Sequence, residues 1–381
     1  MHVFKDQKRG GDNNHAVTDK NNTSLPSISL PKGGGAVRGI GEKFAANPVT
    51  GTGSMRVPIP TSPGRPGFAP ELSLAYDSGT GNGPFGFGWS LSLPSVTRKT
   101  DRGLPQYRDA EDSDVYILSN TEDLVPVSQT DGIKGDDAIE PGFTVYRYRP
   151  RIDATFARIE RWSRNSDGDI HWRSISKENI LTLYGKDDNS RIVDPEDSSR
   201  IFSWLICETR DDKGSVILYD YKPDDGAGVD LTHTCERNRG DHDDPRRKTN
   251  RYLKRIRYGN GKPLLDNAGR RPDLLTEGML QNADWMFQVV FDYGEHDTDN
   301  PTASGEPKKW NYRNDPFSSY RPGFEVRTTR LCQRVLMFHD FPAQPDVGRD
   351  CLVRSTDFTY SFQKEPTGSR NPDTNVRRAA T

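Results

Sequence analysis

Residues 201–221 read IFSWLICETRDDKGSVILYDY, two apolar runs joined by a short polar segment. The runs Ile201–Glu208 and Ser215–Tyr221 are rich in β-branched and aromatic residues, and Asp211–Gly214 between them supplies Asp and Gly. Two apolar runs separated by a turn of this composition are typical of a β-hairpin. We therefore expect two adjacent antiparallel strands here, the clearest local structure that the sequence indicates.

The same alternation continues on both sides of this hairpin. Upstream, Ser54–Pro60, Glu71–Tyr76 and Gly88–Val96 place apolar side chains at every second position, as half-buried strands do. Further strand-like runs are 115–118, 124–127, 143–148, 156–162, 170–175, 180–184, 252–258, 285–293, 326–338 and 352–362. Helical periodicity is confined to a short turn near 274–280, and a polar loop covers 222–250. The sequence thus predicts an all-β fold of roughly fifteen short antiparallel strands and hairpins in a curved sheet.

A glycine-rich connection, GTGNGPFGFG, spans Gly79–Gly88. We expect several of its glycines at positive φ, with Phe85, Phe87 and Trp89 closing the core of the sheet. The stretch 81–86 also matches G-x-G-x-x-G letter for letter. A phosphate site of that pattern needs a helix after the loop, whereas here Pro84 removes an amide and another strand follows. The pattern favours a tight turn.

Composition narrows the classes of function. The chain has 381 residues, a net charge of -2 and 32% hydrophobic residues. A near-neutral protein has no global field that attracts nucleic acid, and its local basic runs, such as 246–248 after Asp243 and Asp244, are largely self-neutralised. No stretch approaches the ~18 apolar residues of a membrane helix, and no apolar segment follows the N-terminal charges. We expect no nucleic-acid partner and no direct membrane insertion. The protein would be made in the cytoplasm and released to the extracellular region without a visible signal peptide.

The chain divides into three parts that differ in composition and in apolar patterning. Residues 1–26 are polar and read as a disordered lead-in, 27–362 form the β domain, and 363–381 are a polar tail or linker. A final strand over 352–362 would leave a sheet edge open unless further β-structure covers it. We therefore expect the chain to be one piece of a larger architecture, with the downstream part missing.

Candidate sites for chemistry are sparse. His233, Cys235, Asp241 and His242 form the one cluster with three kinds of metal ligand, and it lies in the polar loop. Asn165–Asp169 resembles part of a calcium loop but lacks its closing Glu, so a β-turn explains it. The histidines show no paired metal spacing, and no G-x-S-x-G elbow marks a nucleophile, although a triad could still assemble in space. Cysteines 207, 235, 332 and 351 form no C-x-x-C pair, which leaves free thiols or a Cys332–Cys351 bridge. We expect no catalytic, cofactor-binding or metal-binding residues.

Two groups of motifs go beyond generic β-sheet. The first is Ser29–Leu93, with SLPKGGGA, GIGEKF, a T-G-x-x-x-x-P-I-P segment and the glycine-rich hairpin. The second comprises Phe291–Glu295, Trp310–Ser318, Tyr320–Arg327, Leu331–His339 and Leu352–Tyr360. Together they resemble the SpvB N-terminal domain family, which is shared by the Salmonella virulence protein and the B components of insecticidal toxin complexes. The resemblance covers 27–362.

The resemblance implies a structural role. In that family the B component joins a C-type Rhs protein in a hollow β-shell around a toxic effector, and the shell docks through a propeller onto an A-type pore component. This chain would form the start of that shell wall. Its Tyr184-Gly185 and Tyr258-Gly259 pairs resemble Rhs/YD strands.

Two alternatives remain open. Family members of the SpvB type carry a C-terminal ADP-ribosyltransferase domain, so the chain could be the targeting or secretion domain of such a toxin. No E-x-E occurs in this sequence, and Arg354-Ser355-Thr356 lies too close to Gln363-x-Glu365 for separate parts of a transferase site. Catalysis is therefore not expected. A glycan-binding β-module is the other alternative, which aromatic residues such as Trp162, Trp172 and Trp310 would favour if they were exposed.

Overall fold

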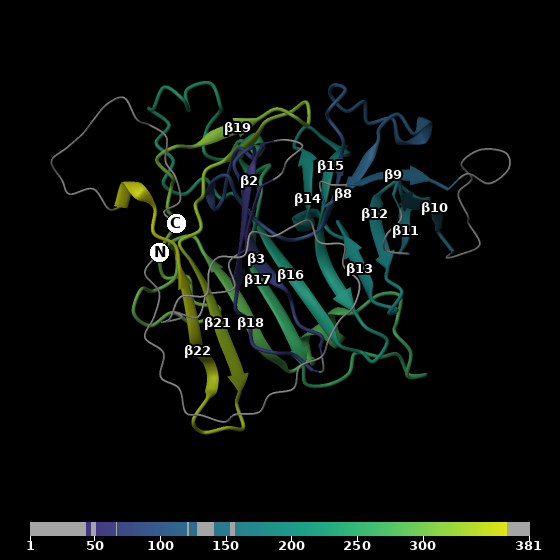
Figure 1. The fold of residues 1–381 in the computed structure, drawn as a ribbon, viewed down its shortest axis with the longest axis vertical. Coiled ribbons are helices and arrows are strands. Elements are labelled where there is room, and N and C mark those ends of the chain that lie inside the picture. The colour runs from purple at the N-terminus through teal and green to yellow at the C-terminus, as the bar shows by residue number, and fades with distance from the viewer. Residues whose placement is uncertain are drawn as a thin grey trace.

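The computed structural model describes residues 43–46, 51–65, 67–119, 122–127, 141–152 and 157–363. These residues form an almost entirely β structure of antiparallel strands (Figure 1), which confirms the predicted fold class. There are twenty-two strands in the described residues. The excess over fifteen comes from pieces of two to four residues, such as β4 (Asn82–Gly83), β5 (Gly86–Phe87) and β14 (Arg191–Asp194), which are too short to show an alternation.

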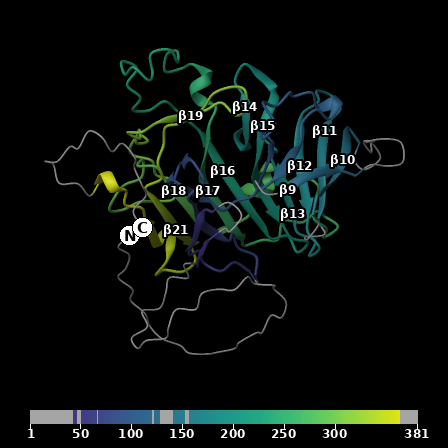
Figure 2. The same ribbon diagram turned by 45° about the horizontal axis from the view of Figure 1, so that its top comes forward.

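Eight strands close into a barrel, which the sequence did not predict. They follow the order β7-β8-β9-β10-β11-β12-β13-β15 and then return to β7. Their bounds are β7 Ser95–Arg98, β8 Tyr116–Leu118, β9 Glu122–Pro126, β10 Phe143–Pro150, β11 Arg158–Arg164, β12 Ile170–Ile175, β13 Leu181–Tyr184 and β15 Asp197–Arg210. Closure depends on the fourteen-residue strand β15, which pairs with β7 through Ser203 and with β13 through Thr209. Figure 2 shows β9 to β13 side by side in the barrel wall.

Aromatic side chains fill the barrel. Tyr116 lies 4.8 Å from Trp172 and 5.8 Å from Trp204 between ring centroids, and Tyr148 lies 4.9 Å from Trp172. The barrel of eight strands is just wide enough for side chains to fill. Arg98 is fully buried at one end, where Asp109 of the short helix η1 (Asp109–Glu111) pairs with it at 2.7 Å. The interior is thus a packed core.

From β15 the sheet continues outward beyond the barrel. The order is β16 (Val216–Pro223), β17 (Arg251–Asn260), β18 (Trp285–Asp292), β21 (Arg334–Phe341) and β22 (Gly348–Asp357). The predicted hairpin of residues 201–221 is confirmed as β15 and β16. Its turn is held by Asp211, whose Oδ1 accepts from the amides of Lys213 at 2.9 Å and Ser215 at 2.7 Å. The predicted helical turn is also present, as α1 (Glu277–Gln281).

A smaller sheet holds the N-terminal described segments. It runs β1 (Lys43–Ala46), β2 (Gly53–Ile59), β3 (Leu72–Asp77) and β6 (Trp89–Leu91). Within the connection from β3 to β6, Gly86 and Gly88 have φ of 96° and 81°, as expected, but Gly79, Gly81 and Gly83 do not lie at positive φ. Phe85 and Trp89 are buried as predicted, whereas Phe87 is exposed. Regular alternation would place all three on one face, but Gly86 and Gly88 at positive φ interrupt it between these residues.

Two predicted strands are each divided in the structure, and a third ends earlier than predicted. Gly88–Val96 divides into β6 and β7, because Pro94 breaks the ladder and the two pieces join different sheets. The run 326–338 divides into β20 (Val326–Thr328), which pairs with β19 (Phe317–Ser319), and β21, because the intervening Arg330 turns into a buried ion pair with Asp224. The last strand, β22, ends at Asp357, where the amide of Phe358 bonds back to Gln333.

The predicted lead-in, 1–26, and almost all of the predicted tail lie outside the described residues. None of the described helices is long and apolar enough to cross a membrane.

Candidate functional site

The glycine-rich hairpin meets a segment more than 200 residues away. Arg313, which is buried, donates from Nη1 to the Gly83 carbonyl at 2.9 Å and from Nη2 to Asn82 Oδ1 at 3.0 Å. Asp315 holds Arg313 Nε at 3.1 Å and accepts from Asn82 Nδ2 at 3.2 Å. The G-x-G-x-x-G backbone is therefore used for a fold contact. A helix does not follow it, so the tight-turn interpretation agrees with the structure.

Phe85 completes this contact at the tip of the hairpin. Its ring meets Phe291 and Phe358 edge-on, with centroids 6.4 Å and 6.0 Å away, and the Pro84 carbonyl accepts from the Cys332 amide at 2.8 Å. The glycine-rich hairpin, which belongs to the first group of family motifs, thus packs against residues of the second group. Sequence spacing alone gave no sign of this pairing.

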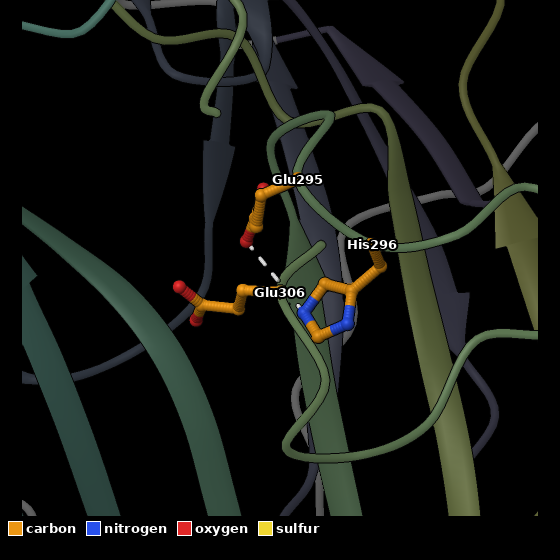
Figure 3. Close-up of side chains that lie close together, drawn as sticks. All are labelled: Glu295, His296 and Glu306. Atoms are coloured by element: carbon orange, nitrogen blue, oxygen red, sulfur yellow. Dashed lines mark ion pairs between the residues drawn. The ribbon is translucent and has the colours of Figure 1, made fainter. Parts of the chain in front are cut away.

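One group of possible metal ligands does form within the described residues, and the sequence did not suggest it. Glu295, His296 and Glu306 place their ligand atoms within 4.8 Å of one another, and the first two side chains are fully buried. Figure 3 shows Glu295 pointing toward His296, with Glu306 beside them; all three come from the segment that follows β18. Glu295 and His296 are adjacent in sequence and Glu306 follows ten residues later, which matches no ligand spacing that could have marked the site.

Lys254 of β17 already supplies the cation for this cluster. Its ammonium group contacts Glu295 Oε1, lies 2.8 Å from His296 Nε2 and 3.4 Å from Glu306 Oε1, and donates to the Phe291 carbonyl at 3.3 Å. A metal ion bound to Glu295 and His296 would have to displace this ammonium. The residues therefore do not fit a resident metal. We interpret the group as an ion cluster that holds the loop between β18 and Trp310 in place.

The protonation of His296 follows from its partners. The Thr302 carbonyl, 3.1 Å from Nδ1, can only accept, so Nδ1 carries the proton and Nε2 accepts from Lys254. Burial and the neighbouring Lys254 charge lower the pKa of His296 below its usual range. Burial likewise lowers the pKa of Lys254, to about 8, so this side chain remains charged at neutral pH. A second proton on His296 would face an ammonium group directly.

We expect this cluster to make the protein less stable in mild acid. Because the folded-state pKa of His296 is depressed, its contribution is complete above the ordinary value of about 6.5 and is lost as the pH falls below it. Each unit of pKa depression is worth about 1.4 kcal/mol. Urea unfolding at pH values from 7.5 to about 5, above the range where free Glu side chains titrate, should show the loss.

His296→Gln is the matched variant, since its amide can accept from Lys254 but does not titrate. Buried His171, whose pKa is lowered to about 3 by burial and by Arg173, responds in the same direction and remains in both proteins. The difference between the two stability profiles therefore isolates His296. Parallel profiles across this range would contradict the assignment.

The candidate residues of the polar loop do not assemble into a site. His233, Cys235, Asp241 and His242 are exposed, and they form no ligand group in the described part of the chain. The loop is organised instead by a residue that sequence reasoning missed. Glu236 is 1% exposed and accepts from Arg247 at 2.6 Å, Arg327 at 2.5 Å and Tyr312 at 3.0 Å. Burial acts to raise the pKa of Glu236, but these hydrogen bonds outweigh it and hold that pKa below its usual range.

One serine–histidine contact is present. Ser62 Oγ lies 2.6 Å from His339 Nε2, and Tyr258 Oη donates to the Ser62 carbonyl at 2.6 Å. In the described residues no carboxylate bonds the His339 ring, which packs against Phe287 and Phe341. A base in a catalytic triad needs a third group that orients it. We therefore interpret the Ser62–His339 contact as structural, one that fastens the β2–β3 connection to the large sheet.

The remaining candidates have structural roles. Residues 165–168 form the turn between β11 and β12, with Gly168 at φ 75°. Trp162, Trp172 and Trp310 are 4%, 0% and 2% exposed, so they are core residues and not a glycan-stacking surface. Arg354 lies in β22 and Gln363 in the short helix η4 (Ser361–Gln363), while Glu365 is outside the described residues.

The four cysteines are free thiols. Cys351 pairs in register with His339, whereas Cys332 precedes the start of β21 at Arg334. At about 3.4 Å per residue along β21, this puts the two near opposite ends of the β21–β22 hairpin, far beyond the ~7 Å Cα limit of a disulfide. The Cys332–Cys351 bridge that the sequence left open is therefore absent.

A closed barrel continued by an open sheet defines the class of this chain as an all-β domain. Residues 47–341 match the family described as Salmonella virulence plasmid 65kDa B protein. The chain is 39% identical over 321 residues to a mono(ADP-ribosyl)transferase SpvB of Salmonella choleraesuis (strain SC-B67). The chain belongs to the SpvB family, as the sequence motifs indicated.

Solved structures agree with this assignment. The N-terminal domain of the effector protein SpvB from Salmonella typhimurium strain LT2 has a TM-score of 0.69 at 35% identity, covering 85% of this chain and 97% of that one. The TcdB2-TccC3 crystal structure has a TM-score of 0.70 at 32% identity, covering 89% of this chain and 16% of that one. The match to the transferase covers 82% of this chain and 51% of the relative, so the chain spans about half the length of that protein. The chain is thus a toxin-associated β domain.

Proposed function

We propose that this chain is a non-catalytic wall module of a toxin-complex B-type protein, and that it contributes to a β-shell around a toxic effector. The observation that carries the proposal is the likeness to the TcdB2-TccC3 structure, in which a domain of this fold makes up 16% of a much longer chain. The partners would be a C-type Rhs protein that completes the shell and an A-type pore component. The assembly would act after release from the cell.

The open edge of the large sheet supports this role. β22 is the last strand in the sheet order and pairs only with β21 among the described strands. Leu352 and Val353 are 38% and 45% exposed along it. An exposed strand edge offers unpaired amides and carbonyls for another strand. In a shell wall this edge would continue into the next strand.

We expect the isolated 381-residue chain to self-associate through β22. Replacing both Leu352 and Val353 with Lys should convert the associated form to monomer, since charge on an edge strand opposes strand addition. Size-exclusion chromatography with light scattering measures the change. The matched control is Leu104→Lys, an exposed leucine in a loop remote from this edge in the sheet order.

A monomeric parent chain with a sharp, cooperative thermal transition would contradict the incomplete-wall proposal. It would indicate a self-sufficient domain. Association that persists in the double Lys variant would place the contact elsewhere on the surface.

We expect no ADP-ribosyl transfer by this chain, because the sequence holds no E-x-E and Arg354 belongs to an edge strand. Incubation with labelled NAD and actin, followed by electrophoresis, measures transfer. The Arg354→Ala variant is the control. Labelling of actin that this variant abolishes would overturn the non-catalytic role.

The second candidate is an N-terminal targeting or secretion domain of an ADP-ribosyltransferase toxin. It is favoured by the 97% coverage of the SpvB N-terminal domain structure. Co-purification with a C-type toxin-complex protein distinguishes the two, because only the shell module requires that partner.

A further inference from the structure

The mouth of the barrel holds a cavity of about 970 Å³. It lies between the barrel wall, at β10, β11 and the start of β12, and the hairpin of β14 and β15, which extends past the barrel rim. Its floor includes Arg161, Ile170 and Ile201. Barrel mouths are common places for small-molecule sites. The core aromatic residues fill the interior below, so a ligand would be held at the mouth.

The charges around this cavity largely cancel each other. Arg191 binds Asp169 through two contacts of 2.5 and 2.9 Å, and Arg164 contacts Asp167 at 2.8 Å. The lining counts four arginines against six carboxylates. Because its net charge is negative, a phosphate or other anion is disfavoured. These carboxylates form no metal-ligand group in the described part of the chain, which argues against a divalent cation.

An apolar ligand also fits poorly. The aliphatic lining is limited to Ala110, Ile170, Val193, Pro195 and Ile201, and the rest is polar, charged or tyrosine apart from one glycine. An apolar ligand would cover the paired ions of the lining with hydrocarbon. The ions would lose their hydrating water and gain no hydrogen bonds in return, which is unfavourable.

Two features of the lining suit a neutral, hydroxyl-rich ligand. Arg161 is 2% exposed and pairs with Asp112 at 3.3 Å, and its Nε, which has no hydrogen-bond partner within the described residues, is itself buried beneath the cavity surface. Its guanidinium stacks 4.4 Å from the centroid of the half-buried Tyr146 ring, which also lines the cavity. At the rim, Glu196 is exposed; Arg246 acts on its carboxylate electrostatically, but no ion pair to Glu196 forms among the described residues. An aromatic ring held in a fixed position and an available acceptor are groups that stack on and hydrogen-bond with a sugar.

We propose that the barrel mouth binds a saccharide, with Tyr146, which Arg161 holds in place, as the stacking ring and with Glu196 as a hydrogen-bonding partner. This inference is independent of the shell role, because it uses the barrel and not the β22 edge. It also differs from the tryptophan-based glycan alternative, since those tryptophans are buried.

The test is saturation-transfer-difference NMR and calorimetry on the full chain. The probes are maltose, lactose, cellobiose and N,N′-diacetylchitobiose, with inorganic phosphate and spermidine as charged comparisons. We expect saturable binding of at least one disaccharide and none of phosphate. Tyr146→Leu and Glu196→Gln should each weaken it about fivefold or more, the effect of one lost hydrogen bond or stacking contact.

Glu111→Gln is the matched control, because this exposed acid lies on the η1 helix next to Asp109 and Ala110 but does not line the cavity. It should leave binding unchanged. Circular dichroism confirms that each variant is folded, and Arg161→Lys, which keeps the charge but loses the planar group, gives a further comparison. Failure of every disaccharide to bind would overturn the proposal, as would binding of spermidine alone or equal affinity in all variants.

Discussion

Replacement of Gly185 by Ala is expected to destabilise the protein by about 2–5 kcal/mol. Gly185 follows β13 with φ of 61°, a left-handed conformation that costs other residues about 1–2 kcal/mol. A Cβ atom there would lie 2.8 Å from the Cβ and Cγ atoms of Trp204 and closer still to its Cδ1. Trp204 is fully buried in the barrel, so it cannot move away without overpacking the core, at about 1–3 kcal/mol.

Gly168→Ala separates the two contributions. Gly168 has a similar φ of 75°, but a Cβ atom there meets nothing within 4 Å. It should therefore cost only the backbone strain of about 1–2 kcal/mol. Urea unfolding of both variants measures the difference. Equal losses would mean that the barrel adapts to the extra methyl group and that the tight contact with Trp204 does not matter.

This position is one case of a repeated arrangement. Tyr184, Tyr258 and Tyr293 are all buried, and the glycine after each lies at positive φ. At Gly259 an added Cβ would meet the ring of Phe287, and at Gly294 it would meet Asn311. In each case the tyrosine enters the core and the glycine lets a neighbouring side chain approach the backbone. These residue pairs are therefore structural in this domain.

Replacement of Glu236 by Gln is expected to cost about 3–5 kcal/mol. The carboxylate faces Arg247 and Arg327, with Arg239 Nε 3.2 Å away, and all three arginines are at least nine-tenths buried. Gln keeps the size but removes the negative charge, which leaves buried cations without their partner. Because Arg327 belongs to β20 and Arg247 to the polar loop, both elements should loosen together. Chemical unfolding and amide exchange over 224–250 measure this effect.

Glu178→Gln is the control, an exposed acid paired with Lys177 at 3.6 Å. Substitutions at such positions usually change stability by less than about 0.5 kcal/mol. A loss below about 1 kcal/mol for Glu236→Gln would show that the arginines find other acceptors, such as Glu325, which already contacts Arg239.

Local patterns in the sequence determined a large part of the fold. The hairpin of β15 and β16, the turn at 165–168 and the strands over 54–60, 71–76 and 252–258 follow from apolar alternation and from Asp and Gly in the turns. These signals are readable because strand formation and tight turns depend on residues a few positions apart. The motifs around 79–93 and 310–339 likewise identified the family from sequence alone.

Tertiary structure alone decided how those strands join. The barrel closes because β15 pairs with both β7 and β13. The alternation of apolar residues along a strand is the same in an open curved sheet and in a closed barrel, so the sequence did not reveal the closure. The sequence did not reveal the polar residues that hold the fold together, for a similar reason. Glu236 and Lys254 look like ordinary surface charges in sequence, but each is largely withdrawn from solvent because its partners arrive from segments 11 to 91 residues away. Charge pairing in space follows no sequence period, so only the folded chain reveals it.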